Sequence, residues 1–379
     1  MILPLSSSLF PKIDRCHFAP FMRFVFRIAI FFALVQSPLR AADNSPDTIA
    51  KYLAGLAVPA VAADSPATGS AWAAHSSAMD EGWKRFRERQ LPGIAQWAPQ
   101  FLDGAYQAQG PMFYFFSGPD FLYAHALFPR ASTYILCGVE QIGPMPDLNA
   151  ISPEVLPSAL ANLRKSMESS LNWSFFITKN MKVDLNQQQL SGVLPILYVF
   201  LARSECTIES TIPVSLNRAG ELVDAGKGET AGIRIVFTSP GASSTQTLYY
   251  FCSDLSDDGI KAHPGFMKFV EKQGDGVSLL KAASYLIHEG GFTRARDFLL
   301  QHSTTLVQDD SGIPFRFFDP NKWDIYFCGQ YIAPIDTFKQ HYQPDLAQAF
   351  VSNPHEALPF GFGYQWQPSR SSLIIAKRR

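Results

Sequence analysis

The first residues that could do chemistry form a small polar turn inside an aromatic run, "FYFFSGPDFLYAHALFP", at positions 113–129. Ser117 offers a hydroxyl and Asp120 offers a carboxylate. In open α/β sheets, ligands bind beyond the carboxyl ends of the strands, and this turn lies there if the preceding strand is central. A structural interpretation competes, in which Gly118 and Pro119 make the turn and Asp120 caps the next helix. The residue types leave both interpretations open.

Two adjacent carboxylates form a second candidate, in "VQDDSGIPFRFF" at positions 307–318. Asp309 and Asp310 could bind a metal ion or divide into acid and base roles, with Ser311 beside them. Neighbouring side chains of an extended strand point to opposite faces, so one acid at most would face a cleft. The order Asp-Asp-Ser-Gly is also typical of turns, and this alternative stays open.

A third candidate lies in "LLKAASYLIHEGG" at positions 279–291. If 278–288 is a helix, Lys281, Ser284, Tyr285 and His288 share one face, because they are spaced at i, i+3, i+4 and i+7. The apolar neighbours indicate that this face is partly buried. A buried lysine or histidine must be paired or lose its charge. We therefore expect Lys281 or His288 to contact an acid of one of the two polar turns.

One further acid could hold a cofactor. Glu140 ends the strand-like segment "YILCGVE", where Rossmann proteins keep a ribose-binding acid. The dinucleotide fingerprint G-x-G-x-x-G, the P-loop, the G-x-S-x-G elbow and H-E-x-x-H are all missing. No Cys/His spacing resembles a zinc site. The sequence therefore predicts no metal, and no motif in it identifies a cofactor.

Alternating strand and helix signals must position these residues. The segment 111–138 reads as strand, short helix and strand, which predicts a βαβ unit with parallel strands. Residues 49–102 read as helical, with a loop over 58–72 and a break at Pro92. Further segments predict helices over 152–176, 185–205 and 335–350, two or three helices over 265–303, strands over 206–216, 232–239 and 247–255, two strands around a tight turn over 304–334, and a hairpin or last strand over 362–379.

These signals predict an α/β fold with a single domain over residues 42–379. Its sheet would be mixed and mostly parallel, with helices on both faces, and a Rossmann-like arrangement fits this class. The apolar share of 47% is typical of a globular protein. A formal net charge of -1 gives no electrostatic reason to expect nucleic acid as a partner.

The N-terminal segment 1–41 has the layout of a secretory signal peptide, whose start could also be Met22. Arg23 and Arg27 precede an apolar run, and cleavage is expected near Ala41. We therefore expect a periplasmic or secreted protein without an integral membrane anchor in the mature chain. The four cysteines after this segment are expected to be buried thiols, and their spacing cannot choose a disulfide pair. They are Cys137, Cys206, Cys252 and Cys328.

Several segments together resemble an uncharacterised family of exported bacterial proteins: "FSGPDFLYAHALFP", "YILCGVEQIGPMPDL", "FFITKNM", "KAASYLIH", "QDDSGIPFRFF" and "PFGFGYQW". The resemblance implies export over nearly the whole mature chain. It implies no activity, cofactor or catalytic residue.

The sequence does not establish a function, and three hypotheses remain. The first is a role in binding a small molecule or in structure, with an aromatic pocket whose polar contacts are Ser117, Asp120, Lys281, His288 and Asp310. The second is an exported hydrolase that uses His288 with Asp309 or Asp310. The third is a Rossmann-like methyltransferase or nucleotide enzyme, suggested by the strand-helix opening and the hairpin-like ending. Export speaks against the third, because cytoplasmic cofactors are scarce outside the inner membrane.

Overall fold

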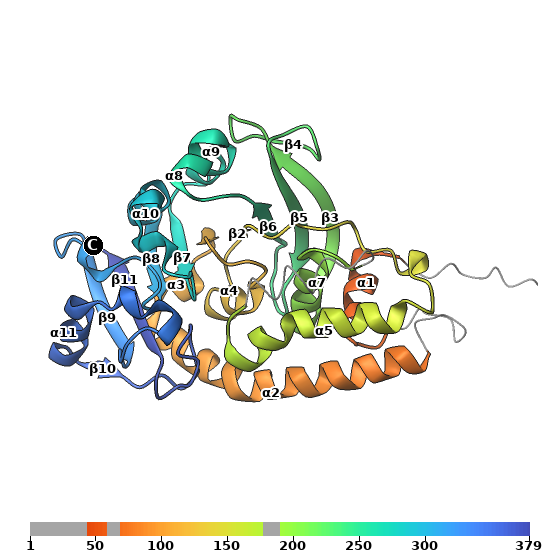
Figure 1. The fold of residues 1–379 in the computed structure, drawn as a ribbon, viewed down its shortest axis with the longest axis horizontal. Helices are drawn as coiled ribbons and strands as arrows, with labels where there is room; N and C mark the ends of the chain where they lie inside the picture. Colours follow the sequence, from red (N-terminus) through yellow and green to blue (C-terminus); the bar gives the residue numbers. More distant parts are fainter. Residues whose placement is uncertain (1–43, 59–68, 177–189) are drawn as a thin grey trace, which may run out of the picture. The chain divides into compact units, whose positions relative to one another are not determined.

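The computed structural model describes residues 44–58, 69–176 and 190–379, all within one compact unit that comprises residues 42–379. The expected signal segment 1–41 lies outside the described residues. Figure 1 shows the chain as a ribbon. The principal helices are α1 (Pro46–Leu53), α2 (Ser70–Phe101), α3 (Gly104–Gln107), α4 (Phe121–Leu127), α5 (Leu156–Trp173), α7 (Leu194–Arg203), α8 (Asp257–Ala262), α9 (Gly265–Glu271), α10 (Thr293–His302) and α11 (Pro344–Ser352).

The strands form one mixed sheet in the order β10-β9-β11-β8-β7-β1-β2-β6-β5-β3-β4. They are β1 (Pro111–Tyr114), β2 (Thr133–Gly138), β3 (Thr207–Leu216), β4 (Leu222–Asp224), β5 (Thr230–Thr238), β6 (Gln246–Cys252), β7 (Gly276–Leu280), β8 (Ser303–Gln308), β9 (Trp323–Gly329), β10 (His355–Glu356) and β11 (Ser372–Arg378). The expected α/β class is confirmed. The βαβ unit is confirmed as well, since β1 and β2 pair in parallel with α4 between them.

The centre of the sheet has the order of a doubly wound fold. From β1 the chain builds β2 and then β6 on one side, and it later adds β7 and β8 on the other. These five strands are parallel, so all their carboxyl ends lie at one edge. The order β6-β2-β1-β7-β8 corresponds to 3-2-1-4-5, which reverses between the first and fourth strands. Such a reversal leaves a crevice outside the strand ends, between β1 and β7.

Helices cover both faces of this sheet, as expected. Met112 and Tyr114 of β1 pack into a core that also holds buried side chains of α1, α2, α4, α5 and α7. Phe113 and Phe115 point the other way, into a second core with side chains of α9 and α10. Figure 1 shows α2 and α5 on one side and α8, α9 and α10 on the other. A strand buried on both faces reads as a continuous apolar run, which explains "PMFYFF".

The helix over 70–101 is not broken at Pro92, contrary to expectation. Both Pro92 and Pro99 lie within α2, and both are exposed. Proline removes one backbone hydrogen bond, and the carbonyl that loses its partner lies four residues earlier. For Pro92 this carbonyl belongs to Glu88, which is exposed, so water can satisfy it.

The expected helix over 278–288 is wrong. Residues 276–280 form β7, which is buried throughout and pairs in parallel with β1 and β8. An irregular loop follows, and only a short 3-10 turn, η3 (Leu286–His288), is helical. The stripe of Lys281, Ser284, Tyr285 and His288 therefore does not exist as a helical face. A fully buried parallel strand lacks the alternation that would distinguish it from a buried helix.

Two other expectations need correction. The strands over 304–318 and 323–334 do not pair with each other, because β11 lies between β8 and β9 and is antiparallel to both. Within 185–205, Pro195 does not interrupt a helix but stands at the first turn of α7, a position that proline favours. Residues 185–189 of that expected helix lie outside the described residues. The expected last strand is confirmed as β11.

Candidate functional site

A pocket opens at the reversal of the strand order. It holds about 810 Å³ of empty space, counting the part that is open to solvent. Residues that follow β1, β2, β6 and β7 line it, including Ser117, Gly118, Asp120, Glu140, Asp254 and Lys281. The aromatic part of the lining is Phe116, Phe175, Phe176 and Phe292, together with Tyr114.

The turn after β1 is tight, and its polar groups are used locally. Phe116 and Gly118 both have a positive φ, of 60° and 53°. The amide of Ser117 donates to the carbonyl oxygen of Cys137 in β2 at 2.9 Å, and its hydroxyl donates to the carbonyl oxygen of Gly118 at 2.8 Å. Asp120 precedes α4, but its side chain makes no capping hydrogen bond. The capping interpretation of Asp120 is therefore wrong.

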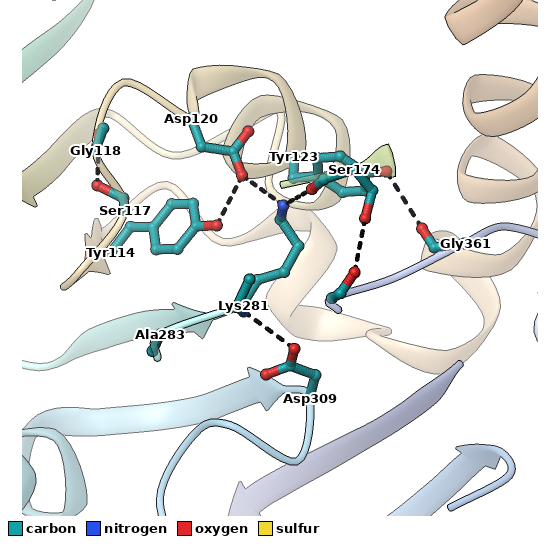
Figure 2. Close-up of polar contacts among 12 residues, drawn as sticks. Tyr114, Ser117, Gly118, Asp120, Tyr123, Ser174, Lys281, Ala283, Asp309 and Gly361 are labelled. Atoms are coloured by element: carbon teal, nitrogen blue, oxygen red, sulfur yellow. Dashed lines mark hydrogen bonds and ion pairs between the residues drawn. The ribbon is translucent and has the colours of Figure 1, made fainter. Parts of the chain in front are cut away.

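Asp120 instead pairs with Lys281 at the floor of the pocket. Nζ of Lys281 lies 2.8 Å from Oδ2 of Asp120, and both side chains are almost completely buried. The hydroxyl of Tyr114 donates to the same oxygen at 2.8 Å. Nζ also donates to the carbonyl oxygen of Ser174, and it lies 4.1 Å from the centre of the Tyr123 ring. Figure 2 shows Lys281 between Asp120 and Ser174.

We call Asp120, Lys281, Tyr114 and Ser174 the floor cluster. It confirms the expectation that Lys281 or His288 contacts an acid, although the lysine comes from a strand end and not from a helix. Among the described residues, Oδ1 of Asp120 is buried without a hydrogen-bond partner. A buried carboxylate oxygen without a partner is costly and calls for an explanation, such as a ligand that donates to it.

Glu140 lies on the other side of the same pocket. It is buried, and its Oε2 lies close to both Gly118 and Gly138, since a Cβ on Gly138 would come within 2.4 Å of that oxygen. The hydroxyl of Tyr250 donates to the carbonyl oxygen of Glu140 at 2.9 Å and lies 3.3 Å from Oε2. The two glycines therefore make room for the carboxylate against the strand ends. Asp254, which follows β6, lines this side too and is exposed.

The wall contributed by the β7 side is a strained loop. Ala282, Ser284 and Tyr285 all have φ between 51° and 56°, although none of them is glycine. Left-handed backbone costs about 1 kcal/mol or more for such residues and persists only where surrounding contacts impose it. Ala282 and Ser284 line the pocket.

Asp309, Ser311 and Tyr364 impose that conformation. Oδ2 of Asp309 accepts the amide of Ala282 at 3.0 Å, and the hydroxyl of Ser311 accepts the amide of Ala283 at 2.8 Å. Tyr364 accepts the amide of Ser284 at 3.1 Å and donates to the carbonyl oxygen of Ala282 at 2.9 Å. Oδ1 of Asp309 also accepts the amide and hydroxyl of Ser311. We call Asp309, Asp310, Ser311 and Tyr364 the loop-support cluster.

Asp310 holds the far end of the loop through Tyr285, whose hydroxyl donates to Oδ2 at 2.6 Å. Burial, and then the neighbouring Asp309, raise the pKa of Asp310 to about 7. Burial also raises the pKa of Asp309. Since Asp310 and Asp309 both bind the loop, the expectation that a turn begins there describes them better than a metal site does.

His288 stands apart from the pocket lining. Its ring meets that of His341 edge-on with centroids 5.4 Å apart, and Tyr285 stacks on His341 at 4.9 Å. Burial, and then His341, lower the pKa of His288 to about 4. Within the described residues, Nε2 of His288 is buried and has no hydrogen-bond partner. The contacts of Asp309 and Asp310 lead to the loop, so the proposed hydrolase pairing with His288 gains no support here.

Two of the three candidate stretches thus meet at one cavity, through Ser117, Asp120 and Lys281. The third, Asp309 to Ser311, lies behind the loop and acts on it. Sequence reasoning missed Tyr114, Ser174 and Tyr364. Tyr114 belongs to the same aromatic run as the turn. Its position close to Ser117 could have indicated that it also lines the pocket. Ser174 contributes a backbone carbonyl, which no residue type reveals.

The described part of the chain offers few side chains for metal binding or for thiol chemistry. It contains no group of three or more His, Cys, Asp or Glu side chains that could hold a metal ion. Three cysteines there, Cys137, Cys206 and Cys328, are buried free thiols, and Cys252 is half-buried. Among the helices of the described segments, none has the length and hydropathy that a membrane span needs.

Comparisons with known protein families, with curated proteins and with solved structures find no match to this chain.

Proposed function

We propose that residues 42–379 form a Rossmann-like nucleoside-binding domain of the methyltransferase type. The observation that carries the proposal is the position of Glu140. Its carboxylate follows the strand beside the switch point and comes 22 residues (140 minus 118) after Gly118 of the first strand-helix turn. In doubly wound folds, an acid about 20 residues beyond this turn accepts hydrogen bonds from the ribose hydroxyls.

The charges of the pocket select among nucleoside ligands. Among the described residues, Asp120, Glu140 and Asp254 line it with Lys281 as the one cation, so the formal charge of this described lining is -2. Dinucleotides and nucleoside triphosphates place their phosphates at the first helix N-terminus. Here Asp120 precedes that helix with its charge paired to Lys281, so a phosphate would meet no unpaired cation among the described lining residues and would face the carboxylates of Glu140 and Asp254. The pocket therefore suits a nucleoside whose tail is neutral or cationic.

S-adenosylmethionine fits this description, because it joins adenosine to a sulfonium and carries no phosphate. When bound, it supplies an electrophilic methyl group. Glu140 would accept hydrogen bonds from the ribose, and Val139 and Leu255 at the same side would pack against the base. The sheet supports the assignment too, since β9 and β11 give the antiparallel ending expected of this fold. The close approach of Gly118 and Gly138 leaves space for the ligand beside Glu140.

Calorimetric titration of the protein with S-adenosylhomocysteine, adenosine, ATP and NAD tests the proposal. We expect the first two to bind and the two phosphate-bearing ligands to bind at least about tenfold more weakly, because like charges cost roughly a kcal/mol or more. Glu140→Gln should weaken S-adenosylhomocysteine, whereas Glu356→Gln on β10 should not. Tighter binding of ATP or NAD, or no binding of either adenosine compound, would refute the assignment.

We also propose export through the segment 1–41, as the sequence suggests. Export and cofactor binding are in tension, because nucleoside cofactors are made in the cytoplasm and an exported protein would have little access to them. Mass spectrometry of the mature N-terminus decides the compartment. Cleavage near Ala41 would make the pocket a receptor for extracytoplasmic nucleosides, and an intact chain in the cytoplasm would remove the export proposal.

A further inference from the structure

The pocket lining changes in character along the strand order. Glu140 and Asp254, which pair with no lysine of the described segments, follow β2 and β6. On the β1–β7 side the lining is apolar, with Phe116, Leu286 and Phe292. The two charges on that side, Asp120 and Lys281, neutralise each other. The pocket thus has an acidic side and an apolar side.

The aromatic side chains of the apolar side pack against neighbouring rings. Phe116 sits in left-handed backbone and meets Phe292 edge-on, with ring centroids 5.9 Å apart. Phe175 meets Tyr364 of the loop-support cluster in the same manner, at 5.0 Å. Leu286 remains 38% exposed at the rim. Rings fixed by neighbours lose little freedom when a ligand covers them, so their burial contributes fully to binding.

We infer that this apolar side is a subsite for a second, uncharged ligand: a small ring-bearing molecule with one hydrogen-bond donor. The aromatic lining selects the ring. The neutral ion pair of Asp120 and Lys281 selects against charge, because a third charge there would lack a partner. In the described part of the chain the buried Oδ1 of Asp120 has no partner, and a hydroxyl or amine of the ligand that reaches it would supply one. The inference rests on the proposed function only in that the second ligand would sit beside a nucleoside.

Three naphthalene probes test the chemistry of the subsite on the wild-type protein, by fluorescence titration. We expect 2-naphthol to bind, 2-methoxynaphthalene to bind about tenfold more weakly because it has no donor, and 2-naphthoate to bind more weakly still because it is an anion. Equal binding of naphthol and methoxynaphthalene would overturn the role of the donor. Equal or tighter binding of naphthoate would overturn the uncharged class.

A matched pair of variants tests the location. Leu286→Asp should weaken 2-naphthol at least about tenfold by placing a charge on the apolar rim. Leu222→Asp, on β4 and equally exposed at 37%, should leave it unchanged. Equal effects of the two substitutions, or no effect of Leu286→Asp, would overturn the location.

Competition separates this inference from the proposed function. S-adenosylhomocysteine should bind Leu286→Asp within about twofold of wild type and should not displace 2-naphthol, since the two ligands occupy different sides. Displacement would overturn a separate subsite. If 2-naphthol binds as described while no adenosine compound binds, the subsite stands and the nucleoside proposal fails. If adenosine compounds bind and 2-naphthol does not, the reverse holds.

Discussion

The floor cluster and the loop-support cluster both bury acids at the carboxyl ends of strands, yet they use them differently. In the floor cluster, the carboxylate of Asp120 pairs with the ammonium group of Lys281, and one carboxylate oxygen has no partner among the described residues. In the loop-support cluster, Asp309 gives its oxygens to backbone amides and to Ser311, and Asp310 accepts from Tyr285. The acids of both clusters are buried, so burial does not distinguish them, and spare hydrogen-bonding capacity is the property on which we base the proposal that Asp120 meets a ligand.

The largest effect is expected from breaking the ion pair of the floor cluster. Lys281→Met leaves Asp120 buried without its cation and should lower the free energy of unfolding by about 3–5 kcal/mol. The double variant with Asp120→Asn should recover much of this loss, because the charge is then gone. Urea unfolding measures both. The exposed pair of Lys227 and Asp224 is the control, and Lys227→Met should cost less than about 1 kcal/mol.

Removing an acid of the loop-support cluster should lower the free energy of unfolding by a smaller amount. It should also weaken ligand binding, because this cluster holds the loop that lines the pocket. Asp309→Ala leaves the amides of Ala282 and Ser311 without their acceptor, which should lower the free energy of unfolding by about 1–3 kcal/mol. Ligand affinity should fall too, because the strained loop relaxes. As a control, Asp319→Ala removes an acceptor from an exposed turn and should leave affinity unchanged. Unchanged affinity in Asp309→Ala would separate the loop from the pocket.

Tyr364→Phe also tests whether the loop-support cluster acts on the pocket through the loop, because the Tyr364 ring does not line the pocket itself. The variant keeps the ring and loses only the hydroxyl that bonds Ala282 and Ser284. We expect a loss of about 1 kcal/mol in the free energy of unfolding. We also expect weaker binding of S-adenosylhomocysteine or 2-naphthol, measured by titration. Tyr326→Phe, on an exposed ring of β9, is the control and should change neither quantity.

The smallest effect at pH 7 is expected from Asp310→Asn, which keeps an acceptor for Tyr285. Its raised pKa means that between about pH 4 and 7 the folded state binds a proton that the unfolded state lacks. The free energy of unfolding therefore falls as the pH rises through this window. Asp310→Asn removes the loss, so its melting temperature relative to wild type should be higher at pH 8 than at pH 4.

His288 should show the opposite sign. Because its pKa is lowered to about 4, the unfolded state binds the extra proton between about pH 4 and 6.5, and stability is lost as the pH falls through that window. His288→Gln removes this loss, so its melting temperature relative to wild type should be higher at pH 4 than at pH 8. The same slope for both variants would contradict the two assignments.

The βαβ unit was predictable because "PMFYFF" and "STYILC" are apolar runs of strand length with a turn and a short helix between them. The strand at 276–280 was not, since five buried residues show no period that separates strand from helix. The contact of Lys281 with an acid follows from the cost of burying a charge, and it survives the wrong secondary structure. The supporting role of Asp309 depends on Tyr364, which is 55 residues away in the chain, and local patterns do not contain such distant pairings.

The position of β11 has a consequence for the order in which the sheet assembles. It comes last in the sequence of strands but lies between β8 and β9, so the hydrogen-bonding edges of both stay open until it arrives. Pairing across so many residues is slow, and an open apolar edge is prone to aggregation meanwhile. We expect the amides of β9 to gain protection late in a pulsed hydrogen-exchange refolding experiment, after those of β1 and β2. Early protection of β9 would mean that it first pairs elsewhere.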